Sequence, residues 1–528
     1  MVKILISDPL SEEGIKILKE IKEFQVDIKT DLKPESLKEI IKDYDALIVR
    51  SATKVNKDVI NASVKLKVIG RAGVGLDNVD LEAATQKGII VMNTPAGNTT
   101  STAEHTMSMI LALSRNIPQA NASTKKGEWK RSKFMGVELY NKILGIVGLG
   151  RIGSEVAKRC LSFGMKILAY DPFLSREVAE RLGIEIVELK DLFERSDYIT
   201  VHTPLTDETK HMISAEEFAL MKKGVRIINC ARGGIIDETA LINAIKEGKI
   251  AGAALDVFEQ EPLPAESELL KLDNVVVTCH LGASTEEAQV NVAVEIAECV
   301  RDYLLGRGIR NAANYPCLEA EVCKVMNPYI NLAEKLGSFS SQLVEGRLKE
   351  INLNYSGQLA QYEISPITLA LIKGLLSPIL QDTVNFINSV SLAKERGIKI
   401  NETKSSQEEE FVNSIQLEIK TDKESRRIFG TLSPNKLPRI VKIDGYYVEI
   451  SPQGEMIVIQ NWDKPGIIGN LGTLLGKHNI NIAAMTFGRE KPGGKAISVL
   501  NVDSPVSVEI LNKIKKTENI LGVKVIRL

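Results

Sequence analysis

One glycine-rich stretch constrains the fold of this 528-residue chain more than any other. The apolar run at 142–147 leads into the hexapeptide 148–153, Gly-Leu-Gly-Arg-Ile-Gly, and residues 155–160 then follow a helical pattern. A second apolar run, at 166–170, ends at Asp171, about 20 residues beyond the glycines, which is the usual spacing of such an acid. Strand, glycine turn, helix and acid-terminated strand in this order predict a dinucleotide-binding unit.

The glycines and the acid also predict how this unit would hold its ligand. Gly148 allows a tight turn, Gly150 lets backbone N–H groups approach a pyrophosphate, and Gly153 lets the helix pack closely on the sheet. The helix N-terminus favours negative charge. Asp171 can accept hydrogen bonds from a ribose diol and would repel a 2′-phosphate, so we expect NAD rather than NADP. The alternative is an ordinary α/β turn in which Asp171 caps the loop before Pro172.

Length and composition exclude several classes of protein. The chain is too long for one core, and roughly three to five domains are expected. With 67 Lys and Arg against 68 Asp and Glu, the net charge is -1, so no global field favours nucleic acid or an anionic membrane. The six cysteines lack paired spacing, and no signal-peptide core or long apolar run is present. We therefore expect an unprocessed cytoplasmic chain with no metal, nucleic-acid or membrane partner.

The first 310 residues read as two α/β units. Up to about residue 95, short apolar runs alternate with amphipathic stretches, which predicts a parallel sheet covered on both faces. A capping box at 101–104 predicts the start of a long helix towards Arg115. The second unit has further strands at 198–202, 225–230, 252–257 and 275–279. Both units are therefore predicted to be doubly wound parallel sheets, a flavodoxin-like substrate domain and a Rossmann NAD domain.

The pattern changes after residue 308. We expect helices at 331–343 and 384–396, strands at 351–355 and 415–419, and a solvated polar loop at 401–410. From residue 455 the order βαββαβ predicts a ferredoxin-like domain. The predicted domains are 1–95 with 284–307, then 96–283, an α+β intervening domain at 308–452, and 453–528.

Three strands of the second unit end beside side chains suited to chemistry, namely Arg232, Glu261 and His280. Parallel strands deliver such groups at their carboxyl ends, so these three are expected to lie close together. A guanidinium can bind a carboxylate through two parallel hydrogen bonds, and a carboxylate beside an imidazole orients it for proton transfer. Taken singly, each has a structural alternative: a surface ion pair, an exposed loop acid, or a capping histidine.

Five stretches extend this interpretation, at 71–80, 148–153, 229–238, 254–262 and 280–285. Together they resemble the D-2-hydroxyacid dehydrogenases. Within that family, the chain resembles the long-form D-3-phosphoglycerate dehydrogenases, which carry an intervening domain before a C-terminal ACT domain. The family commonly has proline before its catalytic histidine, where this chain has Cys279.

The resemblance implies roles for individual residues. Arg232 would hold the substrate carboxylate, His280 would donate and accept the proton, and Glu261 would pair with His280. The implied NAD contacts are Val74, Gly148, Gly150, Arg151, Ile152, Gly153, Asp171, Thr203, Cys230, Ala231, Asp256, Gly282 and Ala283. The implied contacts to a phosphorylated substrate are Arg50, Ser51, Arg71, Gly73, Arg131 and Lys133, of which the last two are otherwise read as part of a solvated loop.

The C-terminal segment resembles a serine-binding ACT domain. Asn461, Asp463 and Asn481 stand where family members contact the effector, or alternatively they cap the first ACT helix. The full resemblance implies NAD-dependent oxidation of 3-phospho-D-glycerate to 3-phosphohydroxypyruvate, the first step of L-serine biosynthesis. It also implies feedback by L-serine, a homotetramer, and a regulatory or assembly role for the intervening domain.

Two rival functions remain open at this point. One is another D-2-hydroxyacid dehydrogenase, such as a glyoxylate or hydroxypyruvate reductase, whose substrate carries no phosphate. The other is a corepressor similar to the C-terminal binding proteins, which keeps the fold as an NAD-sensing scaffold. The ACT-like segment argues against the corepressor.

Overall fold

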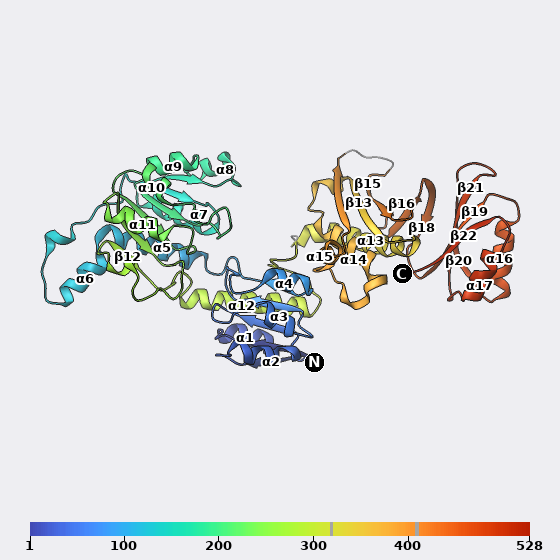
Figure 1. Cartoon of the computed structure of the whole chain (residues 1–528), viewed down its shortest axis with the longest axis horizontal. Coiled ribbons are helices and arrows are strands. Elements are labelled where there is room, and N and C mark those ends of the chain that lie inside the picture. Colours follow the sequence, from blue (N-terminus) through green and yellow to red (C-terminus); the bar gives the residue numbers. More distant parts are fainter. Residues whose placement is uncertain (317–319, 407–410) are drawn as a thin grey trace.

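The computed structural model describes residues 1–316, 320–406 and 411–528, and these residues form four sheets. Figure 1 shows the sheets in separate lobes, with the NAD-type domain on the left and the C-terminal domain on the right. Each sheet corresponds to one predicted fold: two parallel doubly wound sheets, a mixed α+β sheet and an antiparallel ferredoxin-like sheet.

The first domain is a five-stranded parallel sheet in the order β2-β1-β3-β4-β5. Its strands are β1 (Val2–Ile6), β2 (Phe24–Ile28), β3 (Ala46–Val49), β4 (Val68–Arg71) and β5 (Ile90–Met92), and its helices are α1 (Glu12–Lys19), α2 (Pro34–Ile40), α3 (Lys57–Ala62), α4 (Leu81–Gln86) and α12 (Glu286–Leu304). Helix α12 returns from the second domain to pack on α1 and β4. Gly14 makes this possible, since a Cβ there would lie 2.5 Å from the Ala293 carbonyl oxygen.

The second domain is a seven-stranded parallel sheet in the order β12-β11-β10-β9-β6-β7-β8. Its strands are β6 (Ile143–Val147), β7 (Lys166–Tyr170), β8 (Glu185–Ile186), β9 (Tyr198–Val201), β10 (Val225–Asn229), β11 (Ile250–Leu255) and β12 (Val275–Val277). Its helices are α5 (Thr99–Arg115), α6 (Ile117–Lys125), α7 (Arg151–Ser162), α8 (Arg176–Arg181), α9 (Leu189–Arg195), α10 (Ala215–Leu220) and α11 (Glu238–Lys246). The strand order reverses between β6 and β9, which is where open α/β sheets bind ligands.

The predicted capping box is wrong. Helix α5 begins at Thr99, ahead of the proposed cap, and its N-cap residue Asn98 makes no side-chain capping bond. The Ser101 hydroxyl instead donates to the Gly282 carbonyl oxygen at 2.7 Å. A long-range bond to the turn after His280 has therefore replaced the local capping bond.

The third domain packs two helices on a six-stranded sheet in the order β14-β13-β15-β16-β17-β18. The strands are β13 (Leu348–Gly357), β14 (Lys399–Ser405), β15 (Asn413–Thr421), β16 (Ser425–Leu432), β17 (Pro438–Ile443) and β18 (Tyr446–Ile450), and the helices are α13 (Ala320–Leu343), α14 (Ser365–Leu380) and the short α15 (Ser389–Glu395). The helix expected at 384–396 is thus only α15.

The solvated loop expected at 401–410 is also partly wrong, because residues 399–405 form the edge strand β14. It pairs in parallel with β13, and the Asn401 amide donates to the Asn352 side-chain oxygen at 2.8 Å. An exposed edge strand with polar side chains lacks the apolar alternation from which a strand is predicted, so the sequence did not indicate β14. Residues 407–410 lie outside the described residues, as does Cys317, while Cys160, Cys230, Cys279 and Cys299 are free thiols.

The C-terminal domain confirms the predicted βαββαβ order. It comprises β19 (Glu455–Trp462), α16 (Ile467–Lys477), β20 (Ile482–Arg489), β21 (Lys495–Val502), α17 (Val508–Lys515) and β22 (Ile520–Arg527), in the antiparallel sheet order β20-β21-β19-β22. Across the described part of the chain, none of the helices combines the length and apolar character needed to span a bilayer.

Candidate active site

The structure brings His280 and Glu261 together. His280 follows β12 in a left-handed conformation, with φ of 60°, and its backbone N–H donates to the Asp256 carbonyl oxygen at 2.9 Å. Its Nδ1 lies 2.8 Å from Glu261 Oε2, while Glu261 Oε1 accepts from the Phe258 backbone N–H at 3.1 Å. With the Nδ1 proton donated to the carboxylate, Nε2 is the nitrogen left to exchange a proton with a ligand. The imidazole is about half exposed, so a ligand can reach it.

Asp256 holds the turn that carries His280. The carboxylate is fully buried and accepts hydrogen bonds from the Thr278 hydroxyl at 2.6 Å and from the Leu281 and Gly282 backbone N–H groups at 2.7 and 2.9 Å. His105 Nε2 lies 3.2 Å away. Burial alone would raise the pKa of Asp256, but these bonds outweigh burial and lower it. Asp256, expected to contact NAD, is thus occupied by its own loop.

Arg232 follows β10 in a turn shaped by Asn229, whose side chain accepts from the Ala231 N–H at 3.0 Å and donates to the Arg232 carbonyl at 2.8 Å. The next residue, Gly233, touches the loop of Glu261: a Cβ there would lie 1.8 Å from the Phe258 carbonyl oxygen. Only glycine fits at this point, and the close approach places the loops of Arg232 and Glu261 against each other.

Arg71 and Arg232 lie over one glycine loop of the first domain. Arg71 Nη1 would be 2.2 Å from a Cβ at Gly73, and Arg232 Nη2 would be 2.0 Å from a Cβ at Gly75. Burial, followed by the charges of Arg232 and Arg50, lowers the pKa of Arg71 to about 10. The buried Arg71 Nε has no hydrogen-bond partner. Three cations therefore converge here, with one buried donor available for an anionic ligand.

Arg50 and Ser51 follow β3 at the edge of this cluster. The Arg50 backbone N–H donates to Asp8 Oδ2 at 2.5 Å, and its guanidinium donates to the Pro9 carbonyl oxygen at 3.1 Å. Ser51 is exposed. We refer below to Arg50, Arg71 and Arg232 as the arginine cluster.

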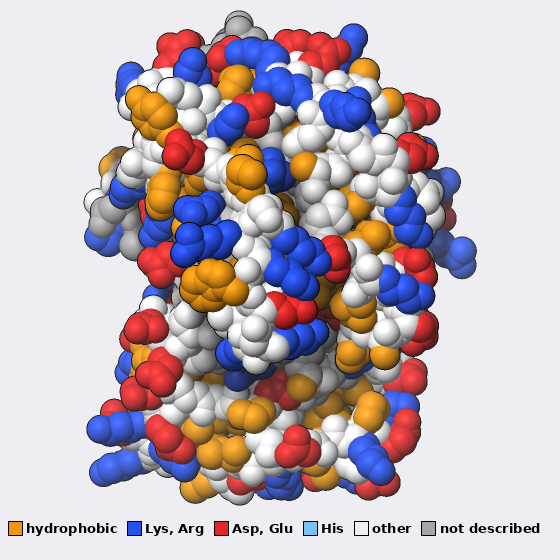
Figure 2. All heavy atoms as spheres, turned by 90° about the vertical axis from the view of Figure 1, so that its left-hand side faces the viewer, with side chains coloured by type: hydrophobic (Ala, Val, Ile, Leu, Met, Phe, Trp, Pro, Cys, Tyr) orange, Lys and Arg blue, Asp and Glu red, His pale blue; other side chains and the backbone are white. Residues whose placement is uncertain are grey.

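Arg131 and Lys133 are not part of the arginine cluster. They lie on the 3-10 turn η2 (Arg131–Phe134), in the segment after α6 that extends from the left of the second domain in Figure 1. Arg131 lies 5.6 Å from the Trp129 ring centre, and Lys133 lies 4.0 Å from Asp273. Figure 2 shows Lys and Arg side chains gathered at mid-height of this face, with hydrophobic side chains among them.

The glycine motif forms a cradle at the switch point of the second sheet. Gly148 has φ of 92°, and a Cβ at Gly153 would lie 2.2 Å from the Gly148 carbonyl oxygen. Gly150 is the N-cap of α7, and nothing lies within 4 Å of its Cβ position, so its backbone is open to a ligand. The first-turn N–H groups of α7, at Arg151 and Ile152, then face an anion. These features fit a dinucleotide pyrophosphate.

Asp171 lies beside this cradle, where its carboxylate accepts from the Leu149 and Phe173 backbone N–H groups, both at 2.9 Å. It therefore shapes both loops and retains lone pairs for a ribose. Thr203, at the end of β9, has a buried hydroxyl without a hydrogen-bond partner and packs on Gly148. This unpartnered hydroxyl next to the glycine turn fits a dinucleotide bound at the cradle.

The remaining predicted cofactor contacts surround the strand ends. Burial raises the pKa of the Cys230 thiol to about 12, so it stays neutral at ordinary pH. The carbonyl oxygens of Val74 and Ala283 accept from the Asn93 and Gln289 side chains at 2.6 and 2.8 Å. Gly282 is buried against Thr102, and Ala231 immediately precedes Arg232.

Of the three proposed effector residues, Asn461 and Asp463 lie at the end of β19, and Asn481 lies just before β20. Asn461 is fully buried and donates to the Trp462 carbonyl oxygen at 2.9 Å. Asp463 accepts from Arg489 at 3.0 Å, and that bond lowers its pKa, while the exposed Asn481 donates to Asp503 at 2.6 Å. None of the three makes a side-chain cap on α16, whose N-cap is Gly466.

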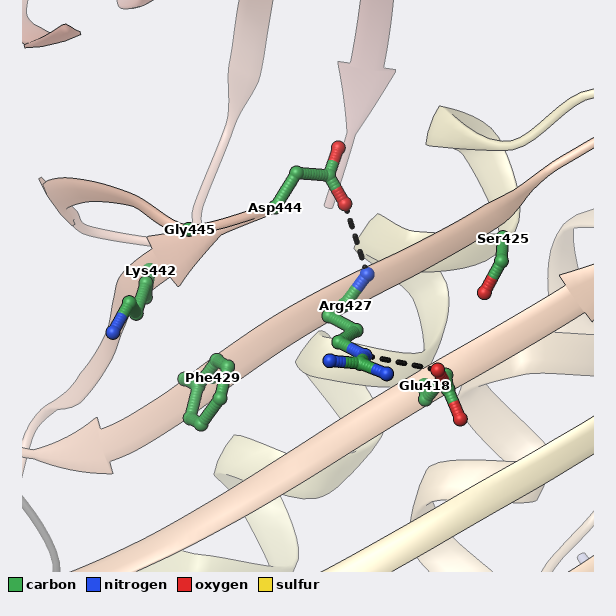
Figure 3. Close-up of a pocket in the computed structure, with 7 residues that line it drawn as sticks. All are labelled: Glu418, Ser425, Arg427, Phe429, Lys442, Asp444 and Gly445. Carbon is green, nitrogen blue, oxygen red and sulfur yellow. Dashed lines mark hydrogen bonds and ion pairs between the residues drawn. The ribbon is translucent and has the colours of Figure 1, made fainter. Parts of the chain in front are cut away.

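A separate hollow of about 510 Å³ lies in the third domain (Figure 3). Arg427 donates to Glu418 at 2.9 Å and its backbone N–H to Asp444 at 2.9 Å, while Lys442 lies 5.5 Å from the Phe429 ring centre. These groups belong to β15–β17 and to the turn after β17, and they share no strand end with His280.

Sequence reasoning missed three groups at the site. His105 and Ser101 lie on one face of α5. His105 contacts Asp256 and Thr278, and Ser101 reaches Gly282 in the turn after His280, which no local pattern signals. Asp77 lies 3.2 Å from Arg232 Nε. The available signal was its place in the stretch at 71–80, which carries part of the family resemblance.

The comparisons with known proteins agree with this geometry. Residues 107–282 match the NAD-binding domain of D-isomer-specific 2-hydroxyacid dehydrogenases, residues 325–444 the D-3-phosphoglycerate dehydrogenase intervening domain, and residues 456–519 the ACT domain. A D-3-phosphoglycerate dehydrogenase of Methanocaldococcus jannaschii is 50% identical over 529 residues, covering 100% of both chains. One of Bacillus subtilis is 44% identical over 528 residues, also covering 100% of both.

Solved structures match the first two domains. A D-lactate dehydrogenase from Aquifex aeolicus, complexed with NAD and lactic acid, is 32% identical, with a TM-score of 0.54 over 60% of this chain and 100% of that one. A glyoxylate reductase from Paecilomyes thermophila is 28% identical, with a TM-score of 0.55 over 59% and 98%. The chain therefore belongs to the D-3-phosphoglycerate dehydrogenase family, NAD-dependent enzymes that carry the cofactor domain of the D-2-hydroxyacid dehydrogenases.

Proposed function

We propose that this enzyme oxidises 3-phospho-D-glycerate to 3-phosphohydroxypyruvate, the first step of L-serine biosynthesis. The observation that carries the proposal is the imidazole–carboxylate pair of His280 and Glu261, 2.8 Å apart, on a loop in contact with the loop of Arg232. The names of full-length relatives at 44–50% identity support the same reaction.

In this mechanism Arg232 binds the substrate carboxylate and so orients C2. His280 Nε2 accepts the proton of the C2 hydroxyl, and the Glu261 charge stabilises the resulting imidazolium. Bound NAD supplies the hydride acceptor. In the reverse direction the imidazolium returns its proton to the carbonyl oxygen, so one pair serves both directions.

The substrate phosphate is assigned to Arg71 and Arg50, supported by their convergence with Arg232 and by the unpartnered Arg71 Nε. Ser51 and Gly73 complete this proposed pocket. Arg131 and Lys133 remain a proposal with less support, because in this chain they lie on the segment after α6.

For NAD, the proposed contacts are the glycine cradle for the pyrophosphate and Asp171 for the adenosine ribose. The loops at Val74, Thr203, Cys230, Ala231, Gly282 and Ala283 would surround the rest of the cofactor. Asp256 is proposed to act chiefly by holding the turn at Gly282, since its oxygens are already bonded.

The test is a comparison of NADH formation from 3-phospho-D-glycerate and from unphosphorylated D-glycerate, in wild type and Arg71→Gln. The proposal predicts a strong preference for the phosphorylated acid that Arg71→Gln reduces. Equal turnover of both acids would support the glyoxylate or hydroxypyruvate reductase alternative. No NAD-dependent turnover of any hydroxy acid would support the corepressor-like scaffold.

We also propose feedback inhibition by L-serine through the ACT domain, supported by the match at 456–519. Asn461, Asp463 and Asn481 are the candidate contacts, and Asn481 is the best variant because its side chain is exposed. Inhibition curves with L-serine should shift to higher concentration in Asn481→Ala. Unchanged inhibition would refute the site.

The proposed domain limits remain 1–95 with 284–307, 96–283, 308–452 and 453–528, supported by the separate sheet in each. Limited proteolysis should cut first near these limits. We also propose that the chain is a cytoplasmic homotetramer. Sedimentation analysis of the purified chain would test the tetrameric state.

A further inference from the structure

Arg232 is already paired with a carboxylate from its own chain. Asp77 Oδ2 lies 3.2 Å from Arg232 Nε, and the pair joins the loop after β4 in the first domain to the loop after β10 in the second. The Arg232 side chain is largely covered, at 27% exposure, whereas Asp77 is 64% exposed. The partner from the first domain is thus the more solvent-accessible member of the pair.

The backbone between the two groups is built for this contact. A Cβ at Gly75 would lie 2.0 Å from Arg232 Nη2 and 2.5 Å from Asp77 Oδ2. Any side chain at Gly75 would therefore separate the carboxylate from the guanidinium. The glycine leaves the space in which Asp77 reaches Arg232.

Charge explains why a carboxylate is needed there when no ligand is bound. Arg50 and Arg232 both act on Arg71 as like charges, which lower its pKa, and the carboxylates of Asp77 and Asp8 oppose that effect. Asp8 is buried and its oxygens are taken by Thr53 and the Arg50 backbone, so it cannot leave. Asp77 is exposed, so it is the counter-charge that can move away from the arginine cluster.

We propose that Asp77 occupies, in the empty enzyme, the place of the substrate carboxylate on Arg232, and that the substrate must displace it. A carboxylate binding Arg232 with two hydrogen bonds would lie against Asp77 Oδ2, and two adjacent anions repel. Asp77 would then swing into solvent. It is a positioning residue that lowers substrate affinity and favours ligands with enough negative charge to compete.

This inference rests on the proposed function only through the role of Arg232. The test variant is Asp77→Asn, which keeps the size of the side chain and removes its charge. The matched control is Glu82→Gln on α4, an exposed acid of the same segment whose partner is Gln86. Both variants remove one negative charge from the same loop–helix unit, and only one touches Arg232.

Two measurements are made on each variant in the full chain. The first is KM and kcat with 3-phospho-D-glycerate, and the second is the dissociation constant of oxalate, a non-reacting carboxylate, from the enzyme–NADH complex by nucleotide fluorescence. For a partly exposed ion pair, Asp77→Asn should tighten both KM and oxalate binding by about two- to fivefold, while Glu82→Gln should not. The change should appear in KM, because the displaced contact opposes binding rather than hydride transfer.

Unchanged or weaker oxalate binding in Asp77→Asn would overturn the proposal. Equal tightening in Glu82→Gln would also overturn it, because oxalate would then respond to the overall negative charge of the segment and not to the contact between Asp77 and Arg232. The oxalate measurement separates the two proposals. If 3-phospho-D-glycerate is not oxidised but oxalate binds more tightly to Asp77→Asn, the displacement of Asp77 is supported and the proposed substrate is refuted.

Discussion

The buried carboxylate of Asp256 gives the sharpest structural prediction, because it fixes the turn that carries His280. In Asp256→Asn one carboxylate oxygen becomes an NH2 donor. The less costly orientation keeps Oδ1 for Thr278 and Leu281, and leaves the Gly282 N–H facing a donor. An unsatisfied buried N–H costs about 1–3 kcal/mol, and weaker neutral bonds cost about 1 kcal/mol more, so local stability should fall by about 2–4 kcal/mol.

The assay is hydrogen exchange by mass spectrometry on peptides covering 278–285. At about 3 kcal/mol, the amides of Leu281 and Gly282 should exchange about 100-fold faster than in wild type. The control is Asp237→Asn, where asparagine can still cap α11 as Asp237 does through its bond to Ala240. Wild-type protection of the turn in Asp256→Asn would refute the claim that this carboxylate anchors it.

The pH dependence of the same turn follows from the lowered pKa of Asp256. Because the folded-state pKa of Asp256 is depressed, its carboxylate contributes stability above the ordinary pKa of 3.8, and this stability is lost as pH falls through the lower folded value. Protection of the turn should therefore persist down to about pH 3.8 and fail below it. The same exchange experiment measures this. Glu261→Gln should lower kcat by about 10²–10⁴-fold in steady-state assays, with the fold unchanged by circular dichroism. Gly233→Ala should separate the Arg232 and Glu261 loops, because its Cβ would lie 1.8 Å from the Phe258 oxygen, and so lower both kcat and thermal stability. Asp171→Asn should reduce the preference for NAD over NADP by about tenfold, read from kcat/KM with each cofactor.

Much of the fold follows from patterns that are local in the sequence. The order of strand, glycine turn and helix at 143–162 needs only neighbouring residues, and the structure confirms it. The C-terminal βαββαβ order is local for the same reason. In contrast, β14 is polar apart from Ile400, and it depends on pairing with β13. The paired residues Ile351 and Ile400 lie 49 positions apart along the chain.

The candidate site was predictable where a residue follows its own strand. His280, Arg232 and Glu261 lie in the loops that follow β12, β10 and β11, which are neighbours in the sheet, so parallel pairing brings these loops together. The support behind them was not predictable, because Ser101 and Asp77 reach the site from distant segments. Asp256 shows the same limit: the family resemblance implied a cofactor contact, and only burial and hydrogen bonds reveal that it holds a loop.

The most direct test of the account is the turnover of His280→Gln with 3-phospho-D-glycerate, measured beside its affinity for NAD. In the proposed mechanism the half-exposed imidazole carries the proton transfer, so NADH formation should fall by about 10²–10⁴-fold while NAD binding and the fold persist. Turnover close to that of wild type would contradict the central claim that His280, oriented by Glu261, exchanges the substrate proton.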